Sequence, residues 1–386
     1  MQTSAHCCDS KGNWDIAPPA EMDSANTLVL IFANTEPTPE VQQQLHQITV
    51  NFPRSVIMGC STAGQIYGSG VEDETIVATV MRFEHTRLHL VQHIIDSSDT
   101  AEETGANIAN KLPRTGLKAV FTLTDGLMVN GSDYTNGLAN NLPEGVTVTG
   151  GLAGDGERFK KTWVMYGRKL QQGMAVACGF YGDAVHVRHA SRAGWDRIGP
   201  KRKVTGANAN ILYSLDEQPA LSLYKKYLGD RAKGLPATGL LYPLGMYNEN
   251  AHEGVTVRTI LSVNEADQSI VLAGNLPEGS SVRLMWASME QLIQGAANAA
   301  EALDMNTFGA NESGVCVAIS CVGRRLVMQR HTRDELDAVM KNLPNGIELV
   351  GYYSYGEISP LVDGRCDLHN QSMTLTLFSE ESPSET

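Results

Sequence analysis

One sequence motif occurs three times in the chain. A proline-led turn runs through a short apolar stretch to glycine and then into a second turn, at 53–66 (PRSVIMGCSTAGQI), 143–155 (PEGVTVTGGLAGD) and 344–358 (PNGIELVGYYSYGEI). Each copy follows a segment with the pattern of a strand and then a helix, and leads into further strand-like sequence. Repetition of one supersecondary unit indicates a fold built by duplication, and its glycine-rich turns are natural places to look for a site.

The segments around each copy predict both strands and helices. Residues 27–33 are nearly all apolar and end at Asn34, which is typical of a buried strand. Thr38 and Pro39 then suit the N-cap and the first position of a helix. Similar reasoning predicts strands at 119–124, 174–181 and 184–190 and helices at 102–112, 218–228 and 289–303. The predicted fold class is α/β (mixed α+β), with duplicated strand–helix–strand–meander units and large mixed sheets.

At 386 residues the chain is too long for one compact core, so two domains are expected. Residues 1–26 are predicted to be a loose leader. A composition break at 194–206, rich in Gly, Arg and Lys, places the boundary between domains at 27–200, which holds two repeats, and at 201–380, which holds the third repeat near 315–378. The cleft between the two domains is the expected ligand site.

Charge and cysteine content exclude several classes of function. A net charge of −13 argues against nucleic acid and anionic membranes as partners. No apolar run is long enough to insert into a membrane, and the polar N-terminus does not resemble a signal peptide, so a cytoplasmic location is expected. Seven scattered cysteines without a C-x-x-C pair make a disulfide scaffold or a four-cysteine zinc site improbable.

Two of the repeated turns suggest chemistry that the other copies do not support. Gly150-Gly151 invites a phosphate-loop interpretation, but no Walker lysine or G-x-G-x-x-G follows it, and a tight strand connection is favoured. Cys60-Ser61 could supply a nucleophile, yet the matching positions are Gly151-Leu152 and Tyr352-Tyr353. A structural turn is therefore favoured there, and no enzymatic activity is predicted.

Two histidines stand in unusual settings. His189 precedes a bend of small residues that ends at Trp195, and His369 lies in a polar triplet that interrupts a strand. A lone histidine in such a place is more often a satisfied structural residue than a ligand. No H-E-x-x-H or other tight pair of histidine and carboxylate suggests a catalytic zinc ion.

Six longer motifs resemble one known family. The segments MGCSTAG (58–64), GGLAGDG (150–156) and HASRAGW (189–195) look like the FIST N-terminal domain. The segments PALSLYKKYLG (219–229), GYYSYGEISP (351–360) and LHNQSMT (368–374) look like the FIST C-terminal domain. The resemblance extends over about 27–380, and the order of the motifs makes it specific.

This resemblance implies a sensory input module of signal transduction. A stand-alone bacterial subset of the family senses nitric oxide through a bound haem and acts on a partner histidine kinase. The chain has the layout of that subset, with both FIST domains and no fused kinase or cyclase. The resemblance therefore implies a cytoplasmic nitric oxide sensor that regulates a histidine kinase, and a homodimer is possible.

If the protein binds haem, its histidines become stronger candidates for the iron ligand, because a neutral imidazole is a common proximal ligand of haem iron. The absence of C-x-x-C-H indicates haem b. The first choice for the iron ligand is His189, the second is His369, and a thiolate such as Cys60 is third. Trp195 would line a haem face, and Arg188 and Arg192 would meet the propionates.

Two alternatives stay open at this point. One is a FIST-type module that binds an amino acid or similar metabolite in the cleft without haem. The other is an enzyme that uses Cys60 or Ser61.

Overall fold

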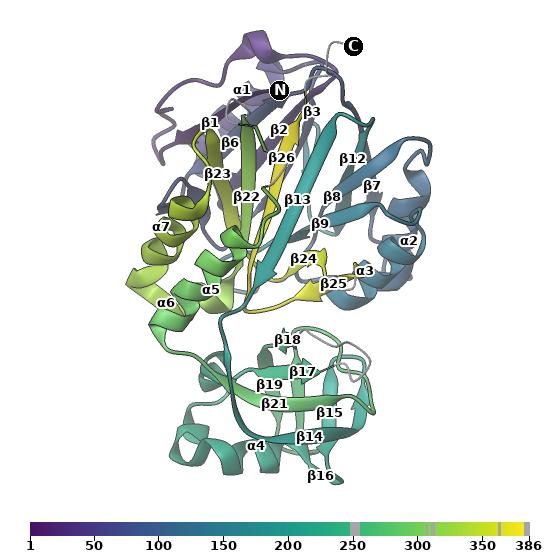
Figure 1. The fold of residues 1–386 in the computed structure, drawn as a ribbon, viewed down its shortest axis with the longest axis vertical. Helices are drawn as coiled ribbons and strands as arrows, with labels where there is room; N and C mark the ends of the chain where they lie inside the picture. Colours follow the sequence, from purple (N-terminus) through teal and green to yellow (C-terminus); the bar gives the residue numbers. More distant parts are fainter. Residues whose placement is uncertain (248–254, 306–307, 310–312, 362–363, 382–386) are drawn as a thin grey trace.

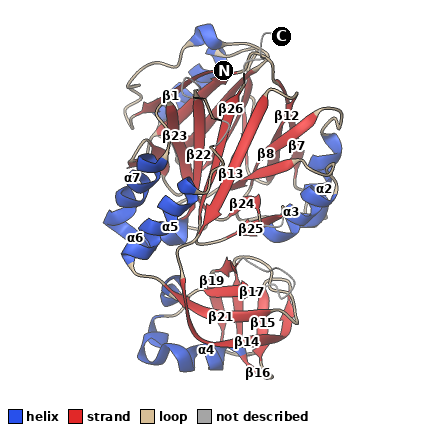
Figure 2. Cartoon of the chain, in the orientation of Figure 1, coloured by secondary structure: helices blue, strands red, loops and turns tan. Residues whose placement is uncertain are grey.

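The structure is a computed structural model that describes residues 1–386 apart from 248–254, 306–307, 310–312, 362–363 and 382–386. Its described strands form three sheets of six strands and one of eight. The three six-stranded sheets make up the body of the molecule, and the eight-stranded sheet forms a smaller lower unit (196–286) beneath it (Figure 1). Figure 2 shows the helices of the body on the outside of its sheets. The predicted α/β (mixed α+β) class with large mixed sheets is confirmed.

The three body sheets share one strand order. An edge strand is antiparallel to the second strand, which is antiparallel to the third; the third and fourth are parallel, and an antiparallel hairpin completes the sheet. The first sheet consists of β1 (Gln2–Cys8), β6 (Ile76–Arg82), β2 (Thr27–Ala33), β3 (Val56–Ser61), β10 (Val164–Tyr166) and β11 (Lys169–Gln171). The second consists of β7 (Arg87–Ile94), β12 (Met174–Tyr181), β8 (Leu117–Thr124), β9 (Thr147–Leu152), β24 (Glu357–Pro360) and β25 (Cys366–His369). The third consists of β13 (Val185–Arg192), β26 (Met373–Glu380), β22 (Gly314–Cys321), β23 (Ile347–Ser354), β4 (Gln65–Tyr67) and β5 (Gly70–Glu72).

Each hairpin completes the sheet of another repeat. The hairpin β4–β5 follows β3 in the chain but pairs with β23 of the third sheet. In the same way β10–β11 joins the first sheet, and β24–β25 joins the second. The exchange runs around all three copies, so each sheet receives its hairpin from one other repeat, and each repeat gives its own hairpin to the remaining one.

The repeated glycine has one structural role in all three copies. Gly59, Gly150 and Gly351 each lie on the fourth strand of a sheet, opposite the third strand. A Cβ atom on these residues would come within 2.0, 1.9 and 1.8 Å of the backbone oxygens of Ile31, Thr122 and Ala318, respectively. Because only a residue without a side chain permits this approach, the motif is explained by the close contact of two parallel strands.

A helix connects the two parallel strands of each repeat, and further helices precede the second and third copies. The described helices of the body are α1 (Pro39–Asn51), α2 (Ala101–Lys111), α3 (Gly131–Asn140), α5 (Met289–Glu301), α6 (Val322–Met328) and α7 (Thr332–Asn342), with 3-10 turns at η1 (Ala20–Met22) and η4 (Gln329–His331). The predicted N-cap is confirmed, because the Thr38 hydroxyl accepts a hydrogen bond from the Val41 amide. Thr100 and Ser288 begin α2 and α5 with capping boxes.

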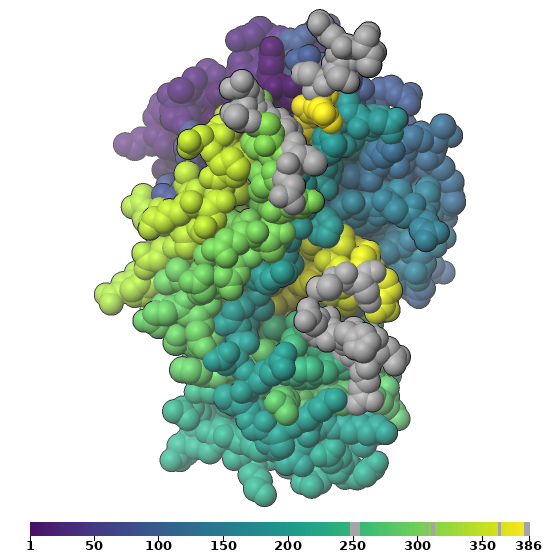
Figure 3. All heavy atoms as spheres, in the orientation of Figure 1, coloured from purple at the N-terminus to yellow at the C-terminus, as the bar shows by residue number. Residues whose placement is uncertain are grey.

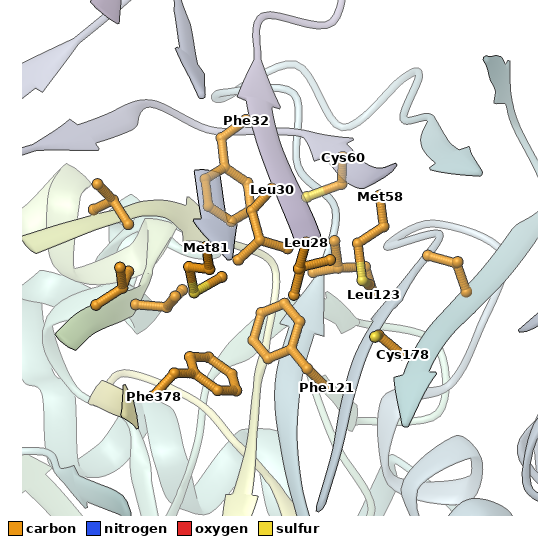
Figure 4. Close-up of a cluster of buried hydrophobic side chains, with 14 of the residues drawn as sticks. Leu28, Leu30, Phe32, Met58, Cys60, Met81, Phe121, Leu123, Cys178 and Phe378 are labelled. Carbon is orange, nitrogen blue, oxygen red and sulfur yellow. The ribbon is translucent and has the colours of Figure 1, made fainter. Parts of the chain in front are cut away.

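Apolar side chains fill both faces of each body sheet. The inner faces of the three sheets meet in one central core that includes Leu30, Phe121 and Phe378 (Figure 4). The outer faces are covered by helices: α1 packs on the first sheet, α2 and α3 on the second, and α5 and α7 on the third. Strands buried on both faces explain the continuous apolar runs in the sequence.

The lower unit is one sheet with a helix and two short turns. Its strands are β14 (Asp196–Asn208), β15 (Ile211–Leu215), β16 (Gln218–Pro219), β17 (Leu244–Tyr247), β18 (Val255–Arg258), β19 (Ile260–Asn264), β20 (Ser269–Leu272) and β21 (Ser281–Trp286). Its helix is α4 (Ala220–Leu228), and its two 3-10 turns are η2 (Gly229–Gly234) and η3 (Ala237–Leu241). The predicted helix stop is confirmed, since Gly229 caps α4. Leu212, Leu221 and Ile270 belong to a separate core in this unit.

Two expectations about chain organisation differ from the structure. The predicted loose leader at 1–26 contains β1, which pairs with β6 along its whole length and forms the edge of the first sheet. The predicted C-terminal domain at 201–380 does not form one continuous unit. The chain enters the lower unit at Asp196, leaves it after Trp286, and returns to place β22, β23 and β26 beside β13 in the body.

Candidate functional site

A large cleft lies between the body and the lower unit. Its volume is about 970 Å³, within the usual size range of ligand sites. The body contributes residues of α3, β13, β25 and the segment after α3, while the lower unit contributes residues of β17 and β18 and the segment around Pro277. In Figure 3 the yellow residues of β24 and β25 lie on the side of the body that faces the teal and green lower unit. The cleft therefore is a place where one ligand can contact both parts of the molecule.

His189 lines this cleft from the end region of β13. Burial lowers the pKa of its imidazole, so the ring is neutral at pH 7. The ring makes no hydrogen bond to any residue of the part of the chain that the structure describes. A neutral imidazole without a protein partner has a lone pair that is available to a ligand or a metal ion.

His369 lines the same cleft from β25, but its ring is held on both sides. Its Nε2 atom lies 3.0 Å from the Ser359 carbonyl oxygen and donates to it, and its Nδ1 atom lies 3.4 Å from the Ser191 hydroxyl. Burial is the main cause that lowers the pKa of His369, although Asp367 acts in the opposite direction. Because both ring nitrogens have partners, His369 is less available as a ligand than His189.

The two histidines are neighbours at a junction between sheets. The charge of a protonated His189 disfavours protonation of His369 and contributes to its lowered pKa. The strand β13 contacts β24, and Ser191 of β13 hydrogen-bonds across to His369. We call this meeting of β13 with β24 and β25 the His189 junction. The tertiary structure thus brings together two candidates that are far apart in the sequence.

The two predicted propionate partners lie in different places. Arg192 lines the cleft, donates to the Ser191 carbonyl oxygen at 2.8 Å, and pairs with no carboxylate among the described residues. Arg188 lies outside the lining of the cleft and is buried, where it donates to the Ser379 hydroxyl at 2.8 Å and lies over the ring of Phe308. Neighbouring residues of a strand point to opposite faces, so Arg188 cannot share the side of His189. Of the two arginines predicted to meet the propionates, Arg192 therefore lines this cleft and Arg188 does not.

Trp195 also differs from its predicted role. Its indole nitrogen donates to the Gln371 carbonyl oxygen at 3.0 Å, and its ring packs with Val257, Leu292 and Met328. Trp195 is 9% exposed and is not among the residues that line the cleft. Its large ring therefore closes the joint between the body and the lower unit instead of presenting a face to a ligand.

Arg258 is the residue of this region that sequence reasoning missed. It extends from β18 of the lower unit into the body, where it donates to the Leu368 carbonyl oxygen at 2.9 Å and lies 3.6 Å from the Asp367 carboxylate. Within its own unit it donates to the Asn275 carbonyl oxygen at 2.8 Å. The available signal was a single arginine within the apolar alternation of β18. This buried cation ties the lower unit to β25, which carries His369.

The side chain of Asn275 strengthens the same contact. It donates to Asp133 at 2.5 Å and accepts from the Asn130 amide at 2.8 Å. Because Asn130 caps α3, the lower unit is also attached to the start of that helix. Polar contacts therefore hold one side of the cleft in place.

The turn with Cys60 and Ser61 is a structural element. Cys60 is fully buried, and burial raises the pKa of its thiol, which opposes formation of a thiolate. The Ser61 hydroxyl accepts a hydrogen bond from the Trp163 amide at 3.0 Å. The favoured interpretation of this turn as structural agrees with these contacts, and Cys60 lies away from the cleft lining.

Comparison of the three body sheets shows what is special about the His189 junction. In each sheet the repeated glycine is level with one residue of the edge strand, and we call this level the glycine row. The residue just before the glycine row on the edge strand is Ala5 in the first sheet, Leu90 in the second and His189 in the third. Ala5 and Leu90 pack against the central core. At the position of His369, the other hairpins have Glu72 and Gln171. The imidazole pair therefore occurs at one of three equivalent junctions, next to the lower unit.

No group of three or more His, Cys, Asp or Glu side chains is arranged to hold a metal ion within the described ranges. Among the helices that the structure describes, none is long and apolar enough to cross a membrane.

Comparison with protein families identifies both parts of the chain. Residues 27–218 match the FIST N domain and residues 220–360 match the FIST C domain. No curated protein matches the chain. The two domains follow one another with one residue between them and together span most of the sequence, which agrees with the motifs in both halves. The chain therefore belongs to the family of FIST-domain sensory proteins.

Proposed function

We propose that this protein is a haem-based nitric oxide sensor with His189 as the protein ligand of the iron. The observation that carries the proposal is the neutral imidazole of His189, which has no hydrogen-bond partner among the described residues and lines a cleft of about 970 Å³. The FIST domains supply the broader sensory role. The resemblance to the nitric-oxide-sensing members of the family supplies the identity of the gas.

The residues of the cleft fit the requirements of a haem. A gas-binding haem needs one neutral imidazole, and burial keeps His189 neutral. It also needs cations for two carboxylates, and Arg192 lines the cleft without a carboxylate partner among the residues described. Apolar walls come from both units, with Val148 in the body and Met246 and Val257 in the lower unit. Haem, when bound, would supply an iron atom that takes nitric oxide as a ligand.

The protein's own contribution is to hold the imidazoles in distinct states. His189 is free to ligate, whereas His369 is fixed by the Ser359 carbonyl oxygen and the Ser191 hydroxyl. The Thr374 hydroxyl in turn donates to Ser191 at 3.0 Å, which orients the serine toward His369. His369 is therefore a positioning residue, and a change at His189 would be transmitted through Ser191 to β25.

The position of the cleft offers a route from ligand to signal. A ligand that contacts both units shifts the population of their relative arrangements, provided that it binds one arrangement better. Arg258 would carry this change, since it joins β18 of the lower unit to β25 of the body. The output is proposed to be the activity of a partner histidine kinase in the cytoplasm.

The test compares two histidine variants in purified protein supplied with haem. The ferrous protein should show a Soret band that moves when nitric oxide is added. His189→Ala should lower haem occupancy or shift the band more than His369→Ala does, because only the first removes the ligand. An unchanged spectrum in the His189 variant would retire the ligand assignment, and a colourless protein at equimolar haem would retire the sensor.

The same preparations test the output. Autophosphorylation of purified histidine kinases from the same genome is measured with the loaded protein, with and without nitric oxide. A change for one kinase that disappears in His189→Ala supports the proposal. Equal autophosphorylation of every kinase under all conditions contradicts it.

A second candidate is a module that binds an amino acid or similar metabolite without haem. The observation in its favour is polar chemistry in the same cleft. The Asn370 side-chain oxygen is buried without a hydrogen-bond partner among the described residues, and Asn370 lines the cleft. Mass spectrometry of the denatured protein, which identifies the released ligand, separates the two candidates.

A further inference from the structure

One of the three equivalent turns carries an insertion. The strands β3 and β4 are joined by 62–64, and β23 and β24 are joined by 355–356. The corresponding strands of the second repeat, β9 and β10, are joined by 153–163. Two copies show that the scaffold closes with a tight turn, so the longer connection is not required by the fold.

The inserted segment is held in one conformation by a buried carboxylate. Asp155 accepts hydrogen bonds from the amides of Phe159, Lys160 and Lys161 at 2.8, 2.9 and 2.9 Å. The Tyr355 hydroxyl also donates to it. Burial acts to raise the pKa of Asp155, but these hydrogen bonds outweigh it and lower the pKa, so the carboxylate stays charged.

Phe159 is displayed to solvent by this arrangement. Its side chain is 46% exposed, and its ring stacks on that of Tyr355 with centroids 4.4 Å apart and planes 13° apart. Its φ of +50° lies in the left-handed region, which costs free energy for a residue with a side chain. The protein thus maintains an exposed aromatic ring in a strained and fixed position, which is typical of a preorganised contact residue.

Cations surround the ring on an otherwise acidic protein. Of the five consecutive exposed residues at 157–161, Arg158, Lys160 and Lys161 are cationic and Glu157 is acidic. Arg158 lies 3.9 Å from the Asp155 carboxylate, whereas neither lysine forms an ion pair with any residue that the structure describes. The net charge of the whole chain is −13, so this cluster of cations has the opposite sign to the net charge of the molecule.

We propose that the docking loop (157–161) binds a protein partner that presents an apolar pocket bordered by carboxylates. The pocket would receive the ring of Phe159, and the carboxylates would pair with Lys160 and Lys161. A compact acidic rim matches the two unpaired lysines, whereas the extended charge of nucleic acid or a membrane would be repelled by the rest of the protein. The inference rests on the proposed function, since the partner would be the histidine kinase that the protein regulates.

The test measures the affinity of the full-length protein for that purified kinase by calorimetry. Phe159→Ala and the double variant Lys160→Glu/Lys161→Glu should each weaken binding at least about tenfold, because they remove the aromatic anchor or reverse the complementary charge. Matched controls are Leu170→Ala, which truncates a residue that is 41% exposed on the nearby hairpin strand β11, and Lys169→Glu beside it. Both controls should bind like the wild type. Circular dichroism melting and the absorbance of the ligand-loaded protein should be unchanged in all variants.

The outcomes separate this inference from the proposed function. If the wild type regulates the kinase and the loop variants bind it equally well, the docking loop is wrong and the sensor proposal stands. Loss of binding in the controls as well as the loop variants also overturns it. If the wild type binds no kinase, both fail together. Loop-dependent binding to duplex DNA or phosphatidylserine vesicles instead would replace the protein partner with an anionic polymer or surface.

Discussion

The His189 junction and the equivalent position at Leu90 occur in two copies of the same repeat but have different side chains and different surroundings. Both residues precede the glycine row on the edge strand of a body sheet. Leu90 packs against the central core, whereas His189 has an imidazole that lines the cleft beside the lower unit. The equivalent positions hold Ala5, Leu90 and His189, and only the one that faces the lower unit holds an imidazole.

The difference teaches where to look for function in a repeated fold. Features that all three copies keep, such as Gly59, Gly150 and Gly351, serve the close approach of strands. Features that one copy alone has, such as His189 and the docking loop, are not needed for folding in the other two. A departure from internal symmetry is therefore a stronger pointer to a site than the repeated motif itself.

The largest expected effect concerns the part that the copies share. Gly351→Ala should lower the free energy of unfolding by about 3 kcal/mol or more, because its Cβ would lie 1.8 Å from the Ala318 backbone oxygen and its φ is +151°. Urea unfolding followed by circular dichroism measures the change. Gly116→Ala is the control, since its φ is +76° but no atom lies within 4 Å of the added Cβ. A loss of only about 1 kcal/mol in both variants, the cost of backbone conformation alone, would contradict the close-approach explanation.

An effect of intermediate size is expected at Glu357, whose counterpart in the first repeat is Gln65. Burial raises the pKa of Glu357 to about 8, despite hydrogen bonds from Ser354 and Ser372 that act to lower it. Between the unfolded pKa of about 4.3 and the folded value, the native state holds a proton that the unfolded state has lost. The free energy of unfolding therefore falls as pH rises through that interval.

Glu357→Gln should remove this dependence, because the amide stays neutral. Relative to wild type, the variant should gain roughly 2 kcal/mol of stability between pH 6 and pH 8, measured by urea unfolding at each pH. The reciprocal change Gln65→Glu should introduce the same loss with rising pH in the first repeat. Parallel pH profiles of wild type and Glu357→Gln would show that the carboxyl group is charged at neutral pH after all.

The smallest expected effect comes from making the two junctions alike. His189→Leu should stabilise the protein by about 1 kcal/mol, since it replaces a partly buried polar ring without a partner by the residue type found at Leu90. Haem binding should be lost in the same variant. Chemical denaturation and haem titration provide the two measurements, and Leu90→His, which should destabilise without creating a haem site, is the matched control. A marked loss of stability in His189→Leu would mean that His189 is a structural residue.

Sequence reasoning located the elements whose signals are local. The strand at 27–33 is β2 with identical bounds, and the helix predicted at 102–112 is α2 (Ala101–Lys111). Thr38 and Pro39 begin α1 as expected, and Gly229 ends α4. These signals depend on apolar runs and on caps, which act within a few residues and therefore survive without knowledge of the rest of the fold.

The errors concern features that depend on distant partners. Residues 1–26 have no strong strand pattern, and β1 forms because β6 offers it a free edge. Trp195 is a large aromatic residue of the kind that often lines a pocket. The residues that it contacts, Gln371 and Leu292, lie more than ninety positions away in the chain. Arg188 was grouped with His189 by its place in the sequence, and the alternation of the strand separates them.

The linear order of residues by itself established a threefold duplicated α/β protein with FIST motifs, and it selected His189 and His369 from ten histidines. Only the tertiary structure decided that hairpins are exchanged between sheets, that the third repeat returns to the body, and that both imidazoles line one cleft. The physical reason is that periodicity and capping are encoded by neighbours in the chain. The pairing of sheet edges and the burial of a side chain depend instead on which residues from distant parts of the chain pack against them.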